Sequence, residues 1–141
     1  MTSKEVDIAY EAEEFFGALD SWDVETQHTL HDGVYSRTII MLAGQALVGA
    51  LIKVPTTLII NGCIKVTIGS DIKHVDGVCV IAASANRKQV MVATRDTSVT
   101  MVFKTNAKTV KEAEDEFTDE SFKLASRLKG AINHISITGE V

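Results

Sequence analysis

Residues 49–62 read GALIKVPTTLIING, and this stretch decides the fold. Two short runs rich in Ile, Val, Leu and Thr lie on either side of Pro55, the single proline of the chain. The second run ends at Asn61-Gly62, a pair typical of tight turns. No apolar spacing of three and four residues passes through the stretch, so it predicts short β-strands and no helix.

The same pattern continues on both sides of this stretch. Short β-branched runs follow one another from residue 33 to residue 105, and turn signals separate them. Such regular spacing predicts a β-sandwich or barrel. The runs are VYSRTIIML (34–42), ALVGALI (46–52), TTLII (56–60), CIKVTI (63–68), GVCVIAA (77–83), KQVMVAT (88–94) and SVTMVF (98–103). The turn signals are Asn61-Gly62, Gly69-Ser70-Asp71, Asp76-Gly77 and Asp96-Thr97-Ser98.

An acidic helix is expected before the strands. Ser3 can cap it, and we expect it to end near residues 17–20. Its apolar face, at spacings of three and four, consists of Ile8, Ala12, Phe15, Phe16 and Leu19.

A second helix is expected after the strands. Thr109 and Glu112 form a capping box, and Gly130 marks the end. One face carries Val110, Ala113, Phe117, Ser121, Leu124, Ala125 and Leu128. The acidic run in its first half and the basic residues near its end suit the helix dipole, so we expect the run to face solvent. The ending INHISIT (132–138) can add an edge strand to a sheet.

Length and composition fit one globular domain. The 141 residues, 45% of them hydrophobic, can bury a core without disulfides or a structural metal. Cys63 and Cys79 stand alone in apolar runs, which indicates buried thiols of a reducing compartment. The acidic start resembles no signal peptide and no run is long enough for a membrane span, so we expect a cytoplasmic protein.

Charge divides the chain into three segments. Residues 1–32 carry one Lys against nine Asp and Glu, residues 33–105 carry eight Lys and Arg against three Asp, and residues 106–141 carry five against seven. We therefore expect an N-terminal acidic helical segment, a β-barrel, and a C-terminal helix and tail. Few aromatics accompany the basic middle, so we do not expect nucleic acid as a partner. A small anion, or the acidic ends of the protein itself, suits the basic segment better, although solvated strand charges explain it equally well.

Residues 33–105 resemble the cupin superfamily, most closely the short metal-less cupin-like proteins of tailed phages. Gly62 matches the turn glycine that ends the first cupin motif, and Gly77 opens the match to the second. The phage-type likeness extends into TNAKTVKEAEDEFTDE (105–120). The resemblance implies a mainly β fold, a single cupin-like jelly-roll barrel, here with an N-terminal and a C-terminal α-helix.

The metal ligands of the cupin motifs are missing. The resemblance places the first His pair among residues 48–51, the Glu at Pro55 and the last His at Lys88. Aliphatic groups and an ammonium supply no metal donors, so neither a metal nor another cofactor is expected. His28 and His31 could share a helix face or straddle a turn, but the sequence indicates no further ligands for them.

Cations near the barrel mouth are the candidate ligand-binding residues. Lys88 takes the cupin His position and should point inward or lie at the rim, with Arg87 on the opposite face unless the turn at Ala85-Asn86 rotates it. Arginine and lysine bind phosphate or carboxylate groups. The predicted set is Tyr35, Arg37, Lys53, Arg87 and Lys88; no catalytic residue is assigned.

Three functions remain open. The first is a non-catalytic binding protein for a small anion, such as a nucleotide or sugar phosphate; in a phage it could sequester a host signalling nucleotide. The second is a structural or virion assembly protein, and exposed sheet faces and edges favour a homo-oligomer in either case. The third is a metal-independent carbohydrate enzyme, which would need a His and Tyr acid–base pair facing the barrel interior.

Overall fold

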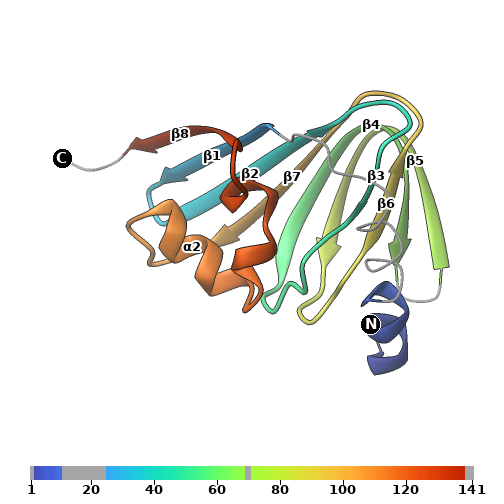
Figure 1. The fold of residues 1–141 in the computed structure, drawn as a ribbon, viewed down its shortest axis with the longest axis horizontal. Helices are drawn as coiled ribbons and strands as arrows, with labels where there is room; N and C mark the ends of the chain where they lie inside the picture. Colours follow the sequence, from blue (N-terminus) through green and yellow to red (C-terminus); the bar gives the residue numbers. More distant parts are fainter. Residues whose placement is uncertain (1, 11–24, 69–70, 139–141) are drawn as a thin grey trace.

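A curved sheet of eight strands dominates the computed structural model, which describes residues 2–10, 25–68 and 71–138 (Figure 1). The strands are β1 (Glu25–His31), β2 (Val34–Met41), β3 (Ala46–Val48), β4 (Thr56–Ile68), β5 (Asp71–Ala83), β6 (Val90–Ala93), β7 (Thr97–Lys104) and β8 (Ile132–Thr138). They follow the order β3-β6-β4-β7-β2-β1-β8, and β5 pairs with β4. The prediction of a mainly β fold is confirmed.

The hairpin of β4 and β5 is longer than predicted. The expected turns at Asn61-Gly62 and Asp76-Gly77 are wrong, because both pairs lie inside 13-residue strands that pair from Thr56–Ala83 to Ile68–Asp71. Gly62 and Gly77 stand opposite each other, with φ angles of +150° and +99°. The glycines therefore bend a continuous hairpin, so that β4 pairs with β7 before the bend and with β6 after it.

The strand β1 was not predicted from the sequence, which placed residues 25–31 in an N-terminal helical segment. Burial alternates along it, with Thr26, His28 and Leu30 inside. Two of these three inward residues are polar, so the strand lacks the apolar alternation that marks a half-buried strand. Before it, residues 3–10 are helical, as expected, but Thr2 and not the predicted Ser3 caps them, because its Oγ1 accepts a hydrogen bond from Glu5 N–H at 3.2 Å. Ala9 is buried there while Ile8 is exposed, and the other predicted face residues lie outside the described part.

Residues 46–53, the covering segment, lie over the concave face of the sheet. The run at 46–52 forms a strand only over β3, and then joins the chain before β6 through a single bridge between Ile52 and Arg87. Two further backbone bonds hold this cover, from Gly49 N–H to Gln89 O at 3.0 Å and from Lys53 N–H to Phe117 O at 2.8 Å. The sheet and this cover enclose the space described below.

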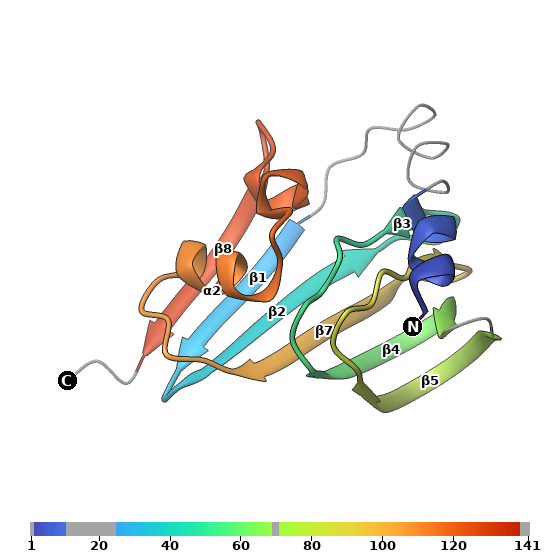
Figure 2. The same cartoon turned by 90° about the horizontal axis from the view of Figure 1, so that it is seen from below.

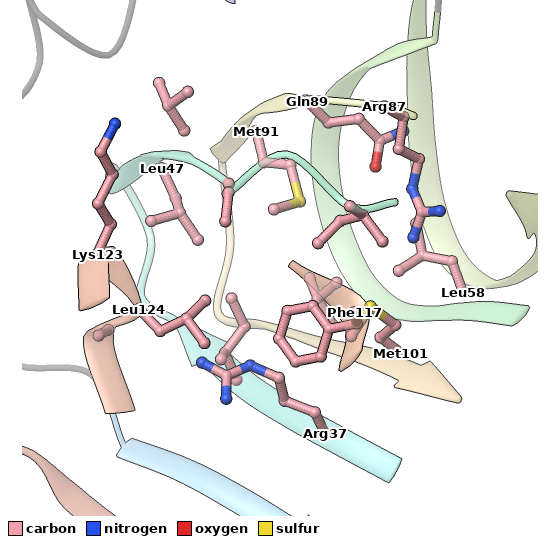
Figure 3. Close-up of a pocket in the computed structure, with 17 residues that line it drawn as sticks. Arg37, Leu47, Leu58, Arg87, Gln89, Met91, Met101, Phe117, Lys123 and Leu124 are labelled. Carbon is pink, nitrogen blue, oxygen red and sulfur yellow. The ribbon is translucent and has the colours of Figure 1, made fainter. Parts of the chain in front are cut away.

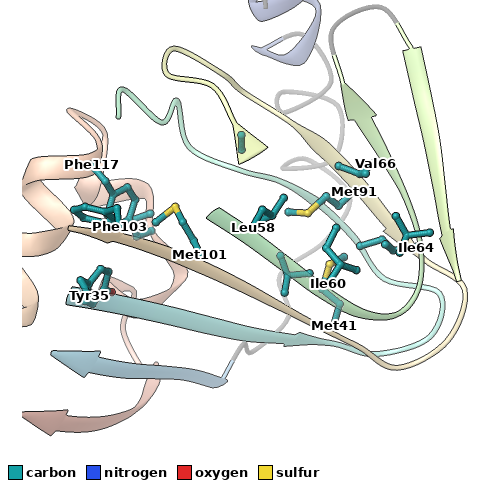
Figure 4. Packing of buried hydrophobic residues seen from close by; sticks show 14 of the residues in the cluster. Tyr35, Met41, Leu58, Ile60, Ile64, Val66, Met91, Met101, Phe103 and Phe117 are labelled. Atoms are coloured by element: carbon teal, nitrogen blue, oxygen red, sulfur yellow. The ribbon is translucent and has the colours of Figure 1, made fainter. Parts of the chain in front are cut away.

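The core fills the concave side of the sheet (Figure 4). At one end Tyr35, Phe103 and Phe117 pack as an aromatic group with ring centroids 5.6 to 6.3 Å apart. Toward the bend of β4 the core is aliphatic and includes Met41, Ile60, Ile64, Val66 and Met91. These residues alternate along their strands, which places their side chains on one face of the sheet.

The C-terminal helix is shorter than predicted. Thr109 caps α2 (Val110–Phe117) by accepting a hydrogen bond from Glu112 N–H, which confirms the predicted start. The helix ends at Phe117 because Thr118 is extended, and two short 3₁₀ turns follow, Ser121–Lys123 (η1) and Ala125–Arg127 (η2). The predicted single helix through Leu128 is therefore wrong, and Leu128 is exposed.

The predicted edge strand at 132–138 is confirmed as β8. It pairs in parallel with β1, and Figure 2 shows β8, β1, β2, β7, β4 and β5 side by side. Cys63 is buried and Cys79 half-buried, and both are free thiols. Among the described residues, no helix is long and apolar enough to cross a membrane.

Candidate functional site

A cavity of about 130 Å³ lies between the concave face of the sheet and the covering segment (Figure 3). Residues 47–50 and 52 and residues 87, 89 and 91 form its outer wall, while Phe117, Lys123, Leu124 and Ala125 line it from the C-terminal segment. The cavity is partly open to solvent and most of its wall is apolar. Such a concave apolar space with a few polar groups is the usual form of a small-ligand site.

Strand register sets the floor of the cavity. Arg37 on β2 stands beside Met101 on β7, which stands beside Leu58 on β4. Ile39 and Val99 form the next row two residues along, on the same face. Arg37 is thus the one cation in an otherwise aliphatic and thioether floor made of these five side chains.

The charge of Arg37 is already balanced. Its Nη1 lies 2.8 Å from Oε2 of Glu114 on α2 and 3.0 Å from Oγ of Ser126, and both Arg37 and Glu114 are buried. The guanidinium also lies 5.7 Å from the centroid of the Phe117 ring. Glu114 further accepts a hydrogen bond from Arg127 Nε at 2.9 Å. This network fastens α2 and η2 to the sheet, and it corrects the expectation that the acidic run of α2 faces solvent throughout.

Arg87 is buried in a different setting. It is only 3% exposed, and its Nη atoms donate to backbone O of Ser84 and Val54 and, at 2.6 Å, to Oγ1 of Thr56. Its Nε–H has no hydrogen-bond partner among the described residues. Burial lowers the pKa of Arg87 to about 10, and no described carboxylate counteracts this. A guanidinium has five N–H donors, so these three bonds leave Nε–H and one Nη2–H without a partner among the described residues. Nε itself is fully buried, so a ligand reaches it only if the guanidinium turns toward the cavity.

The position of Arg87 depends on the preceding turn. Asn86 adopts φ +58°, a left-handed conformation that asparagine tolerates well. After it Arg87 lines the cavity and Lys88 does not. The predicted arrangement placed Lys88 inward and Arg87 on the opposite face unless the turn at Ala85-Asn86 rotates the chain. The turn does rotate it, so Arg87 is the residue that lines the cavity.

Lys88 and Lys53 form ion pairs with carboxylates that follow α2. Lys88 is fully buried, with Nζ 3.5 Å from Oε1 of Glu120 and 4.2 Å from the ring centroid of Tyr10 in the N-terminal helix. Glu120 also accepts hydrogen bonds from Tyr10 Oη and Leu51 N–H. Lys53 is exposed, with Nζ 2.6 Å from Oδ1 of Asp119. Neither lysine lines the cavity, so both leave the candidate ligand-binding set.

Tyr35 lies in the core and not at the cavity. Its hydroxyl is 2.7 Å from Nδ1 of His28, whose Nε2 is 2.7 Å from Oδ1 of Asn133 on β8. Burial lowers the pKa of His28, with the Asn133 bond opposing, and burial raises the pKa of Tyr35 to about 12. A His and Tyr pair therefore exists, but both groups are neutral near pH 7 and both are buried away from the cavity.

Three of the positions to which the cupin resemblance assigns metal ligands form part of the cavity wall, whereas Pro55 and Lys88 do not line it. Val48, Gly49 and Ala50 line it, and none has a metal-binding side chain. No group of three or more His, Cys, Asp or Glu side chains within the described ranges could hold a metal ion. The residues present do not fit the metal of the fold family, since imidazole and carboxylate donors are absent from these positions.

Acidification is predicted to destabilise the fold through two carboxyl groups. Burial raises the pKa of Glu114, but hydrogen bonds from Ser126 and Arg127 and the charge of Arg37 outweigh it and lower the pKa below 4.5. Burial also raises the pKa of Glu120, but hydrogen bonds from Leu51, Tyr10 and Lys123 outweigh it and lower that pKa to about 2. A depressed folded pKa stabilises the protein above the unfolded pKa, and this contribution is lost as the pH falls through the folded value.

The corresponding measurement is urea unfolding at pH 7, 4.5 and 3. We expect the free energy of unfolding to decrease from pH 4.5 downward. In Glu120→Gln the decrease should be smaller, because one of the two titrating groups is removed. A wild-type free energy that stays constant down to pH 3 would contradict the assignment.

Comparison with known proteins supports the fold alone. No protein-family model matches the sequence, and no curated protein matches it. A cupin superfamily protein from Desulfitobacterium hafniense has a TM-score of 0.50 at 10% identity, over 64% of this chain and 86% of its own. An RmlC-like cupin family protein with a double-stranded β-helix fold, from Methanocaldococcus jannaschii, has a TM-score of 0.49 at 13% identity, over 62% and 84%. Together with the curled eight-stranded sheet, the likeness to the Desulfitobacterium hafniense protein confirms the predicted cupin-like jelly-roll fold.

Proposed function

We propose that this chain is a non-catalytic, metal-free binding protein that holds a small anionic molecule in the cavity between the sheet and its cover. The observation that carries the proposal is Arg87, a buried guanidinium beside the cavity with an unpaired Nε–H and no carboxylate partner among the described residues. A buried cation without a counter-charge costs several kcal/mol. An anionic ligand would remove that cost.

The two arginines of the cavity have different roles in this proposal. Arg37 is neutralised by Glu114 and stabilises the floor, whereas Arg87 retains donors for a ligand. A nucleotide or sugar phosphate, the class expected from the sequence, would fit with only its phosphate inside, because the cavity is small. Such a protein could act in the cytoplasm, and if phage-encoded it could sequester a nucleotide of the host.

The test measures the binding of sodium phosphate, AMP, glucose 1-phosphate and benzoate. Isothermal titration calorimetry gives the affinity of each, and thermal unfolding gives the stability that each adds. At a ligand concentration of 100 Kd, binding to the folded state adds about 2.7 kcal/mol to the free energy of unfolding. We expect at least one anion to bind, and Arg87→Lys to weaken it at least tenfold, because lysine keeps the charge but loses the paired donors. Arg95→Lys, an exposed matched control, should leave binding unchanged.

Two outcomes would overturn this function. Binding of none of the four anions would leave Arg87 as a purely structural group. Equal affinity in wild type and Arg87→Lys would place the ligand at another site. Native mass spectrometry of the purified protein, before and after denaturation, would identify a ligand that stays bound during purification.

A structural role is the second candidate, and one surface favours it. The convex face of β5, β4, β7 and β2 carries no charged side chain over three paired rows, although the chain has a net charge of −5. Val78 and Val80 are 71% and 64% exposed there. The rows are Ala82–Thr57–Val102–Ser36, Val80–Ile59–Thr100–Thr38 and Val78–Asn61–Ser98–Ile40.

We propose that a second copy of the chain covers this face. Depletion of charge marks the centre of protein interfaces, and two copies would meet here without like-charge repulsion. Strand and residue spacings give roughly 400 Å² per copy, which is at the small end for specific interfaces. The expected assembly is therefore a weak, concentration-dependent dimer.

Light scattering after size exclusion, over a concentration series, tests the dimer. Val80→Lys should shift the equilibrium to monomer, whereas Lys73→Ala on the other face of β5 should not. A monomer at all concentrations would refute self-association, and a dimer unaffected by Val80→Lys would place the interface elsewhere. Neither result bears on ligand binding, because Val80 and the cavity lie on opposite faces of the sheet.

A further inference from the structure

The size of the cavity limits what can be enclosed beside Arg87. An apolar protein cavity of about 150 Å³ is known to hold one benzene molecule. The present cavity, at about 130 Å³, therefore has room for a body of similar size. A nucleotide is several times larger, so most of it would remain outside.

The walls of the cavity favour an apolar body. The side chains around Arg87 and across the floor are aliphatic, thioether or aromatic: Ile39, Leu58, Met91, Val99, Met101 and Phe117. Gln89 also lines the cavity, but its amide N–H donates to backbone O of Thr67. Sugar hydroxyl groups placed against this wall would lose water without gaining hydrogen bonds, which disfavours a sugar in the cavity.

Charge balance favours a monoanion. Among the cavity arginines, Arg37 is paired with Glu114, and Arg87 alone lacks a described carboxylate partner. Lys123, which also lines the cavity, donates to Glu120 at 3.1 Å. A phosphate dianion would bring two charges to one unbalanced guanidinium in an apolar space, whereas a carboxylate brings one. Two N–H donors of an arginine also match the two oxygens of a carboxylate.

We propose that the ligand is a small organic monocarboxylate with a compact apolar body. Its carboxylate would accept hydrogen bonds from Nε–H and the remaining Nη2–H of Arg87 after a small rotation that turns the buried Nε toward the cavity, and its body would lie among Leu58, Met101 and Phe117. This inference rests on the proposed function, because it names the ligand class of the same cavity. It differs from the phosphate class expected from the sequence.

The experiment is calorimetric titration of the full chain with linear carboxylates from propionate to octanoate, together with benzoate. Affinity should rise about fourfold per methylene, the fold-change that corresponds to about 0.8 kcal/mol per buried CH₂. The rise should stop once the cavity is full, near the size of benzoate. Hexanol and benzyl alcohol, which match the bodies without the charge, should bind at least tenfold more weakly.

Two variants test the carboxylate end and the apolar end of the ligand separately. Arg87→Lys should weaken all carboxylates by a similar factor. Ala50→Leu, which narrows the apolar part from the covering segment, should weaken benzoate and hexanoate much more than propionate. Circular dichroism and the melting temperature of each variant confirm that it is folded before affinities are compared.

The outcomes distinguish this inference from the function on which it rests. If phosphate or AMP binds through Arg87 and the carboxylates do not, the carboxylate class is wrong and the anion-binding function stands. If no anion binds, both fall. If affinity does not depend on the length of the carboxylate, the apolar cavity does not hold the body and the inference is overturned.

Discussion

Glu114→Ala is expected to lower the free energy of unfolding by about 3–5 kcal/mol, because it leaves a buried arginine without its counter-charge. Glu114 is 3% exposed and lies 2.8 Å from Arg37, which is itself 9% exposed. The same carboxylate accepts hydrogen bonds from Arg127 and Ser126, so its loss also removes two of the bonds that hold η2. Urea unfolding at pH 7 measures the effect.

A second variant assigns the loss to Arg37. In Arg37→Met/Glu114→Met both buried charges are replaced by apolar groups, and we expect this protein to be more stable than Glu114→Ala by about 1 kcal/mol or more. Asp119→Ala, which removes an exposed partner of Lys53, is the matched control and should change stability little. If the double variant is as unstable as Glu114→Ala, the cost arises from lost packing of α2 and not from an unpaired Arg37.

The fold could be predicted from the sequence where apolar residues alternate. The runs around Ile40, Ile60, Val80, Met91 and Met101 all belong to strands of the structure. The ending at 132–138 was also identified, although every residue of β8 is exposed. The strand β1 was missed because its inward positions include Thr26 and His28, whose side chains carry no apolar signal.

Turn chemistry misled the prediction at two positions. Asn61-Gly62 and Asp76-Gly77 are strong hairpin signals in isolation. Here the two glycines are paired across a hairpin whose own turn lies elsewhere, and only the register of the strands reveals this. A glycine signal in a sequence does not distinguish a turn from a bend within a strand.

The candidate site could be predicted only in part. Arg37 was identified as a cation on a strand-like run and Arg87 as the neighbour of the cupin His position, and both line the cavity. Which of them keeps free donors could not be predicted, since that depends on Glu114, which is 77 residues away from Arg37 in sequence. Phe117 and Leu124 line the cavity because the chain breaks after α2. The helical periodicity of the sequence continues through that break, so their position could not be predicted.

Gly62→Ala is expected to destabilise the protein by about 2–4 kcal/mol, the second largest effect we predict. A Cβ built at Gly62 would lie 2.3 Å from Oγ1 and 2.7 Å from Cα of Thr97, and the second of these atoms is backbone. Thr97 cannot move away easily, because its Oγ1 accepts a hydrogen bond from Cys63 N–H and it is 1% exposed at the start of β7. Thermal unfolding in parallel with urea unfolding measures the loss.

Gly77→Ala is the matched control, because Gly77 pairs with Gly62 across the same hairpin and also has a positive φ. A Cβ at Gly77 would meet nothing within 4 Å, so this variant bears the backbone strain without the steric contact. The difference between the two variants therefore reports the contact with Thr97 together with the difference in backbone strain between φ +150° and φ +99°. Equal losses would mean that backbone strain accounts for both glycines and that β4 does not approach Thr97 closely. A larger loss in Gly62→Ala would show that the bend of β4 is fixed by its packing against β7, the strand that supplies two of the five side chains of the cavity floor.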